Sequence, residues 1–201
     1  MTSTNEPSQG GVSIQGGFSF GRAARAKDRD VAALEAADPG GIDSDSLWAA
    51  ARRFATGVTV VAAAADEGYL GITVSAFSLL SLDPPLALVS IHTESQLTDA
   101  IEASGAFAVT ILGGRQEQLA ETFAGRAPRP DPSFNDIPHR TLLTGAPILA
   151  GGLAWFDCRL EETHSGGDHS IFIGRVVAAG VASGQDDPLL YFGSQYRRLA
   201  P

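Results

Sequence analysis

The chain has 201 residues, of which 44% are hydrophobic, so it is long enough to fold as one domain with a substantial core. Its formal net charge of −9 argues against nucleic acid as a partner, because an acidic surface repels phosphate backbones. The single cysteine, Cys158, excludes an internal disulfide, and no apolar run approaches the length of a membrane span. We therefore expect a cytoplasmic protein with no membrane association.

The N-terminal part differs in composition from the rest of the chain. Residues 1–41 are rich in glycine and poor in large apolar side chains, which predicts a flexible arm. Within it, Asp28–Ala37 has a weak helical pattern. The folded domain is predicted to span residues 42–201 and to begin with a helix at Asp43–Arg53, where apolar side chains recur at helical spacing.

After this helix, strand-like runs rich in valine, isoleucine and phenylalanine follow one another, and several are separated by glycine or proline turns. Two helices are expected between them, at Thr98–Ala103 and Arg115–Phe123. Six or seven strands with so few helices favour a mainly β fold, a closed or nearly closed barrel. The predicted strands are Val58–Ala64, Tyr69–Ser75, Leu86–Ile91, Phe107–Leu112, Ala154–His164, Ser170–Gly180 and Leu189–Tyr191.

The stretch Gly71–Leu86, GITVSAFSLLSLDPPL, is mostly apolar but carries four hydroxyl side chains. A buried hydroxyl costs free energy unless it is hydrogen-bonded. Bonds to backbone carbonyls at a strand end would explain one or two of them. The alternative is a loop, held rigid by the proline pair, that presents hydroxyls to a ligand. The four residues are Thr73, Ser75, Ser78 and Ser81.

A second hydroxyl-rich turn, SIHTESQLTDA, covers Ser90–Ala100. Ser95 or Thr98 can cap the following helix, which is the commoner use of these residues, and a helix N-terminus can also hold an anion. Two such turns after neighbouring strands suggest a phosphate-bearing ligand held by neutral donors. His92 lies in the same turn and can equally be a surface residue.

Two further segments carry candidate chemistry. His169 follows the turn SGGD, and its imidazole can bond a carboxamide, although a solvated hairpin histidine is commoner. Asp168 can orient this ring only if its side chain folds back. The C-terminal PLLYFGSQYRRL combines tyrosines and arginines, which can clamp a nucleotide or simply pack. Rossmann, P-loop, nucleophile-elbow and metal-ligand patterns are absent from the sequence.

Taken together, these segments resemble the flavin reductase-like family, the short-chain reductase components of two-component flavin-dependent monooxygenases. Each segment alone is a weak signal, but six in the same order are specific. The resemblance covers roughly Ser46 to Leu199. Its segments are FATGVTVV (Phe54–Val61), Gly71–Ile91, Ser95–Leu112, LAETFAG (Leu119–Gly125), Thr144–Val177 and Pro188–Leu199.

The resemblance implies an FMN-binding split β-barrel that forms a homodimer, with flavin at the subunit interface. It implies FMN or FAD as flavin, NADH or NADPH as reductant, and an oxygenase component that receives the reduced flavin. The reaction would be hydride transfer from nicotinamide C4 to flavin N5. The alternatives are a split-barrel oxidase that uses bound FMN on another substrate, such as a small amine, and a non-catalytic flavin-binding module.

The resemblance also implies roles for individual residues. His169 matches a histidine near the nicotinamide, and we expect it to be catalytic. Gln96 stands where many relatives carry arginine, which leaves the choice between FMN and FAD open, and Ser75 stands where relatives often have asparagine. The residues expected to bind the cofactors are Thr56, Gly57, Thr73, Val74, Ser75, Ala76, Phe77, Ser78, Ser90, Ile91, Ser95, Gln96, Leu97, Phe123, Tyr191, Tyr196 and Arg197.

Overall fold

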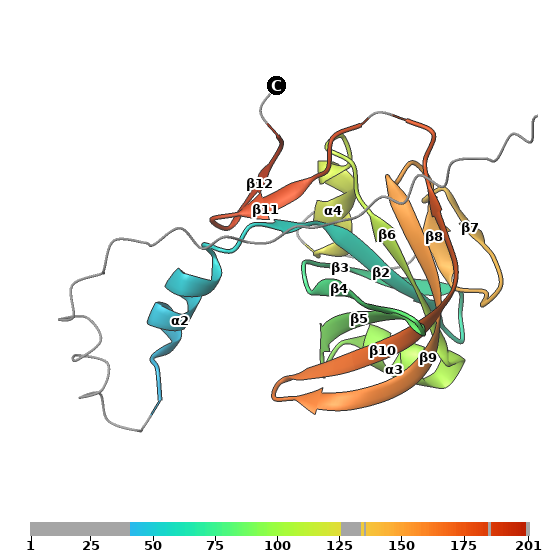
Figure 1. Ribbon diagram of the computed structural model, residues 1–201, viewed down its shortest axis with the longest axis horizontal. Helices are drawn as coiled ribbons and strands as arrows, with labels where there is room; N and C mark the ends of the chain where they lie inside the picture. Colours follow the sequence, from blue (N-terminus) through green and yellow to red (C-terminus); the bar gives the residue numbers. More distant parts are fainter. Residues whose placement is uncertain (1–40, 126–133, 135, 185, 200–201) are drawn as a thin grey trace, which may run out of the picture. The chain divides into compact units, whose positions relative to one another are not determined.

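A computed structural model describes residues 41–125, 134, 136–184 and 186–199 (Figure 1). All helices and strands of the described residues belong to the unit Ser44–Pro201. Nearly all of the predicted N-terminal arm, including the weak helix at Asp28–Ala37, lies outside the described residues. Within the described part of the chain, no helix is long and apolar enough to cross a membrane.

Seven strands form the main sheet: β2 (Thr59–Ala64), β3 (Tyr69–Val74), β4 (Phe77–Leu82), β5 (Pro85–His92), β6 (Ala106–Ile111), β9 (Ala154–Gly166) and β10 (His169–Val181). Their order is β3-β2-β6-β9-β10-β5-β4, and every neighbouring pair is antiparallel. The sheet curls so that its edge strands β3 and β4 are joined at a corner, Ser75–Ala76, without a ladder between them in the described residues. This arrangement confirms the predicted split β-barrel.

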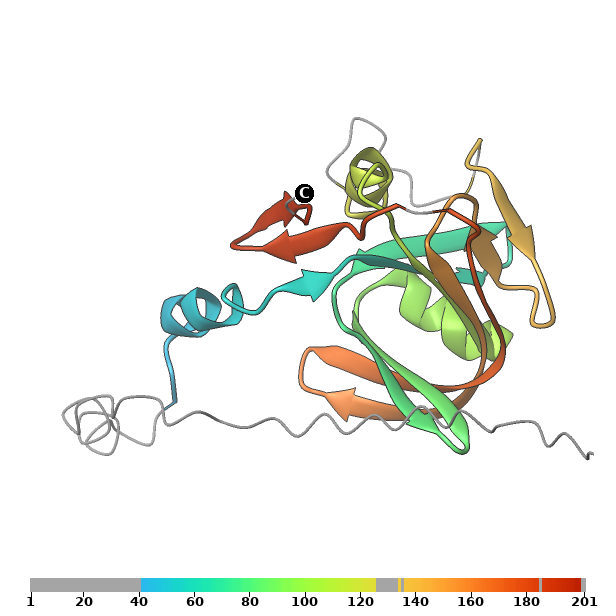
Figure 2. The ribbon, with the colours of Figure 1, turned by 45° about the horizontal axis from the view of Figure 1, so that its top comes forward.

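Three helices accompany the sheet: α2 (Ser44–Ala51), α3 (Gln96–Ser104) and α4 (Glu117–Phe123). All three were predicted, with ends within a few residues. The curled sheet wraps around α3, as Figure 2 shows. A small sheet combines β1 (Thr56–Gly57), β11 (Leu190–Phe192) and β12 (Gln195–Arg197), and β7 (His139–Thr141) pairs with β8 (Pro147–Leu149). The strands β1, β7, β8 and β12 were missed, because two or three residues rarely reveal an alternating pattern.

The strand β2 is buried on both of its faces. Val61 and Ala63 point into the core that also contains α3, whereas Val60 and Ala62 face a second core beneath α4. Since successive side chains of a strand point to opposite faces, a strand covered on both sides must be apolar at nearly every position. The sequence TVVAAA meets this requirement, and it places β2 between the two cores.

One sequence-based expectation was wrong. The predicted strands left out the stretch between Ser75 and Leu86, and one interpretation made its hydroxyls part of a rigid loop, but residues 76–82 form the corner residue Ala76 and the edge strand β4. Leu82 pairs with Pro85, so Asp83 and Pro84 form the turn of a hairpin and Pro85 is the first residue of β5. An edge strand leaves one side of its backbone unpaired, and much of β4 is exposed. Serines are therefore tolerated there, and they conceal the strand pattern.

A buried carboxylate attaches the loop between β7 and β8 to the sheet. Asp157 of β9 is fully buried and accepts hydrogen bonds from the backbone N–H groups of Leu143 (2.9 Å) and Thr144 (3.2 Å) and from the Thr144 hydroxyl. The next residue, Cys158, lies in the main core, and burial together with the charge of Asp157 raises the pKa of its thiol to about 12. Asp157 and Cys158 therefore have structural roles, in fixing the loop and in filling the core.

Candidate functional site

The site begins at the corner Ser75–Ala76. The Ser90 N–H donates to the Ala76 carbonyl at 3.1 Å, which ties the corner to β5. Ser78 pairs with Leu88, two residues before Ser90. Because paired residues of an antiparallel ladder project to the same face, Ser78 and Ser90 share the outer face of the sheet. The corner and the start of β4 thus present polar groups outward.

A cavity of about 250 Å³ lies beside this corner. The rings of Tyr191 and Tyr196, from the C-terminal strands β11 and β12, contact one another edge to face with centroids 5.4 Å apart. The structure therefore brings together the corner and the C-terminal tyrosines, which were separate predictions. The lining residues are Trp48, Val58, Thr73, Val74, Ser75, Ala124, Tyr191 and Tyr196.

Two hydroxyls near this cavity have different environments. The Thr73 hydroxyl donates to the Ala120 carbonyl of α4 at 2.7 Å, so its proton serves to attach β3 to this helix. The Thr56 hydroxyl oxygen is buried and has no hydrogen-bond partner among the described residues. Thr56 pairs with Tyr191, which lines the cavity. Because an unpartnered buried hydroxyl costs about 1–3 kcal/mol, a polar ligand atom at this place would be stabilising.

A second cavity of about 250 Å³ adjoins the first, since Ala124 at the end of α4 lines both. Ser95 is the N-cap of α3, and its hydroxyl accepts from the Leu97 N–H at 3.3 Å, as the capping prediction expected. Gly71 lets the rings of Phe123 and Phe134 approach β3, because a Cβ there would lie 2.9 Å from both. The second cavity is lined by Leu70, Gly71, Ile72, Ser95, Gln96, Leu97, Thr122, Phe123, Ala124 and Gly125.

Neither cavity is lined by a charged side chain among the described residues. The lining consists of hydroxyl, amide and backbone groups beside aromatic and aliphatic surface. This chemistry fits a flavin, whose flat ring needs apolar walls and polar partners at its edge, and whose ribityl chain matches hydroxyl groups. A phosphate in either cavity would be held by neutral donors.

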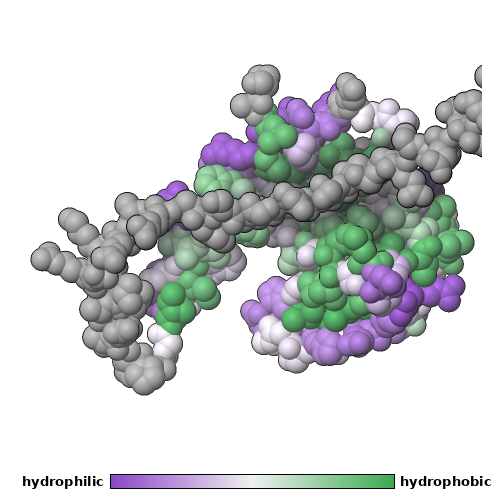
Figure 3. Space-filling view, in the orientation of Figure 1, coloured by the Kyte–Doolittle hydropathy of each residue, from purple (hydrophilic) through white to green (hydrophobic). Residues whose placement is uncertain are grey.

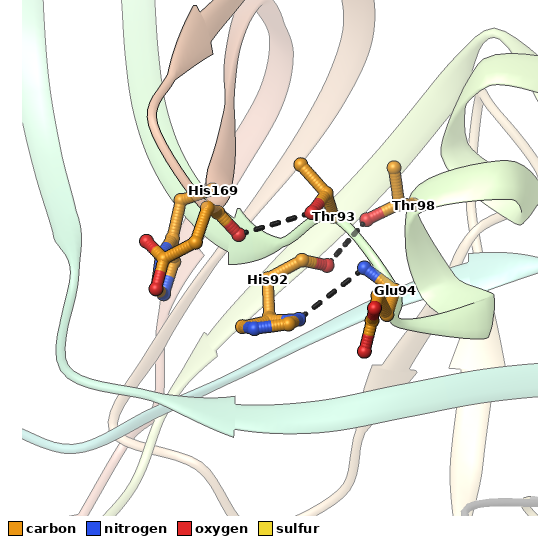
Figure 4. A network of polar contacts seen from close by, with 6 residues as sticks. His92, Thr93, Glu94, Thr98 and His169 are labelled. Carbon is orange, nitrogen blue, oxygen red and sulfur yellow. Dashed lines mark hydrogen bonds and ion pairs between the residues drawn. The ribbon is translucent and has the colours of Figure 1, made fainter.

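His169 lies at the start of β10. Its Nδ1 is 2.7 Å from the Asp168 Oδ1, so the Asp168 side chain does fold back onto the ring. The hydrogen bond from His169 lowers the pKa of the exposed Asp168 carboxyl, and the charge of His169 acts in the same direction. The ring of His92 lies edge to face with that of His169, with centroids 5.4 Å apart (Figure 4). Sequence reasoning did not connect these histidines, because only the β5–β10 register brings them together.

Several predicted binding residues do not direct their side chains into either cavity. The Ile91 side chain belongs to the main core, Phe77 packs against Phe156 with ring centroids 5.3 Å apart, and Arg197 is exposed. Gly57 pairs with Leu190 in the small sheet. These residues could contact a ligand in either cavity only through their backbone atoms, or contact a part of the ligand that extends out of the cavity. Their roles in binding therefore stay predictions.

Comparison with known proteins gives a consistent result. The model of the family described as "Flavin reductase like domain" matches residues 51–200. The FMN reductase (NADH) SmoA of Agrobacterium fabrum is 38% identical over 164 residues, which cover 81% of this chain and 90% of SmoA. The reductase component of 4-hydroxyphenylacetate 3-monooxygenase from Thermus thermophilus is 39% identical over 147 residues, 73% of this chain and 91% of that protein. The NADH:FAD oxidoreductase SgcE6 of Streptomyces globisporus superposes with a TM-score of 0.72 at 33% identity, covering 82% of this chain and 96% of SgcE6.

Proposed function

Because the chain belongs to the flavin reductase-like domain family, we propose that it is an NAD(P)H:flavin oxidoreductase that supplies reduced FMN or FAD to a partner monooxygenase. The observation that carries the proposal is the pair of adjoining, uncharged cavities beside the corner Ser75–Ala76. SmoA is named for FMN and SgcE6 for FAD, and both names include NADH. Since these nucleotides are intracellular reductants, the proposal places the protein in the cytoplasm.

When bound, a flavin would supply the redox chemistry, because its N5 can accept a hydride from the nicotinamide C4. The residues of the chain would bind, orient and shield the cofactors. Thr73, Ser75 and Ser78 would hold the edge of the ring at the corner, and Ser90 and Ser95 the ribityl and phosphate end. His169 would position the nicotinamide. Reduced flavin must then leave for the oxygenase, so moderate affinity suits a site without charged lining groups.

The oxygenase partner is proposed from the relatives. The Thermus thermophilus relative is named as the reductase component of a monooxygenase, so it works with a separate oxygenase component. The same division of labour in this chain would make flavin a substrate that is reduced here and consumed elsewhere.

The proposed assembly is a homodimer. The helix α2 has no buried residue, and its Leu47 and Trp48 side chains are 54% and 71% exposed. The edge strand β4 exposes Leu80 and Leu82, and Figure 3 shows hydrophobic surface over both α2 and the β4 region. Exposed apolar surface of this kind usually marks a contact with another protein. A second copy covering α2 would also enclose the cavity that Trp48 lines.

Removing the apolar side chains of α2 should separate the subunits. We expect the double variant Leu47→Ser, Trp48→Ser to sediment as a monomer in analytical ultracentrifugation and to bind FMN about tenfold more weakly. The control Val181→Ser, at an equally exposed position on β10, should stay dimeric. A double variant that keeps the mass of the wild-type dimer would contradict the assignment of α2 to the interface.

The reaction itself is tested by anaerobic mixing of the protein with a reduced nicotinamide nucleotide and a flavin. Crossing NADH and NADPH with FMN, FAD and riboflavin should bleach the visible flavin absorbance for at least one combination and so identify both cofactors. A flavin-binding module would leave the absorbance unchanged under every combination. An oxidase of the same fold would bleach its flavin with an amine instead.

A further inference from the structure

The two histidines beside the turn between β9 and β10 are held in fixed positions by the backbone around them. His92 of β5 lies directly opposite His169 of β10, so both side chains project from the same face of the sheet. The Thr93 N–H and hydroxyl both donate to the Asp168 carbonyl, at 3.0 and 3.1 Å. The Ser95 N–H and the Thr98 hydroxyl donate to the His92 carbonyl, each at 3.0 Å. Figure 4 shows the bonds made by the Thr93 and Thr98 hydroxyls, which connect the end of β5 with the turn and with α3.

The hydrogen bonds of the two rings determine where each neutral imidazole carries its proton. An ionised carboxylate only accepts hydrogen bonds, so the His169 Nδ1, 2.7 Å from the Asp168 Oδ1, carries a hydrogen. A backbone N–H only donates, so the His92 Nδ1, 3.2 Å from the Glu94 nitrogen, carries none. When both rings are neutral, they are therefore opposite tautomers. In that state His92 presents an N–H at its Nε2, and His169 presents a lone pair at its Nε2.

We propose that His92 and His169 together form the recognition site for the nicotinamide carboxamide, His92 donating to its oxygen and His169 accepting from its NH₂ group. The inference rests on the proposed function, and it adds His92 to the site as a specificity-determining residue. No described residue forms a hydrogen bond with either Nε2 atom, and the His169 side chain is 42% exposed. Both atoms are thus available to a ligand.

The donor and acceptor pair selects among the functional groups that a nucleotide could present. A primary carboxamide has one acceptor and two donor hydrogens on neighbouring atoms, so it satisfies both rings. A carboxylate, as in nicotinic acid adenine dinucleotide, only accepts and would meet the His169 lone pair. A methyl ketone, as in the 3-acetylpyridine analogue of NAD⁺, keeps the oxygen but lacks the NH₂ group. The donor at His92 and the acceptor at His169 therefore favour the amide over both analogues.

The tautomers can be read directly in the protein without any cofactor. Long-range ¹H–¹⁵N spectra distinguish the two neutral tautomers of each histidine, and the chain has only four histidines. Assigned with the His92→Phe and His169→Phe variants, His169 should show the Nδ1–H form and His92 the Nε2–H form. Asp168→Ala should remove the preference of His169 alone. Identical tautomers for the two rings would overturn the inference.

Binding of NAD⁺, which does not reduce oxidised flavin, tests recognition apart from turnover. Calorimetric titration of the FMN-loaded protein should give about tenfold tighter binding of NAD⁺ than of the 3-acetylpyridine analogue. His92→Phe keeps a ring but loses the donor, and should weaken NAD⁺ about tenfold while retaining that preference. His169→Phe should abolish the preference. His92→Gln, whose amide N–H can donate, should recover most of the affinity.

His164→Phe is the matched control, because His164 is also an exposed histidine of this region, paired with Glu162. It should bind NAD⁺ like the wild type. The inference would be overturned if His92→Phe bound NAD⁺ like the wild type. It would also be overturned if His92→Phe and His92→Gln weakened NAD⁺ binding equally, since the two histidine rings would then serve only to pack against each other. If the wild type reduces flavin and either result is found, only this inference fails; if it reduces no flavin, the proposed function fails.

Discussion

Replacing His169 by alanine is expected to lower kcat/KM for NADH by about 10²-fold, because a misplaced nicotinamide loses the alignment that hydride transfer needs. The Kd for flavin should change by less than about twofold. The reason is structural: His169 lines neither of the two cavities, and it interacts with Asp168 and His92 instead. We therefore expect flavin affinity and nicotinamide positioning to depend on different residues.

Anaerobic stopped-flow reduction of FMN by NADH measures the first quantity, and quenching of flavin fluorescence on binding measures the second. His164→Ala is the control, because this histidine belongs to the neighbouring strand and is exposed. Undiminished NADH oxidation by His169→Ala would show that His169 has no catalytic role. Equal losses in flavin binding and turnover would place His169 at the flavin.

Replacing Asp157 by alanine is expected to lower the free energy of unfolding by about 3 kcal/mol, since hydrogen bonds to a charged group contribute about 1.5–3 kcal/mol and buried donors are left without a partner. The carboxylate is fully buried and accepts from the Leu143 and Thr144 N–H groups and the Thr144 hydroxyl. Without it, the loop between β7 and β8 loses its attachment to β9.

Equilibrium unfolding in urea measures this effect. The control Asp66→Ala removes an exposed carboxylate and should change the free energy of unfolding by less than about 0.5 kcal/mol. A loss below about 1 kcal/mol in Asp157→Ala would mean that the loop finds other partners for its N–H groups. Asp157→Asn, which keeps an acceptor oxygen, should fall between the wild type and the alanine variant.

The hydroxyls of Gly71–Leu86 show where sequence reasoning reached its limit. Four hydroxyls in an apolar stretch indicated that they form hydrogen bonds, either to the backbone or to a ligand. The sequence did not show which hydroxyl does which. In the structure, the Thr73 hydroxyl binds the Ala120 carbonyl and Ser75 lines the same cavity, whereas Ser78 shares the outer face of the sheet with Ser90. The Ala120 carbonyl belongs to a helix far along the chain, so no local pattern could reveal the bond.

The sequence by itself determined the fold class, and it predicted a region for the site. The features that it revealed are local: apolar runs with β-branched residues, glycine and proline turns, and a helix capped by Ser95. Each depends on the conformational preferences of neighbouring residues in the sequence. Only the tertiary structure decided which of these segments meet. Strand register and helix packing place His92 opposite His169, let Ala124 line both cavities and bury Asp157. Register is set by burial of one sheet face across many residues, and this cooperative property cannot be read from any single segment.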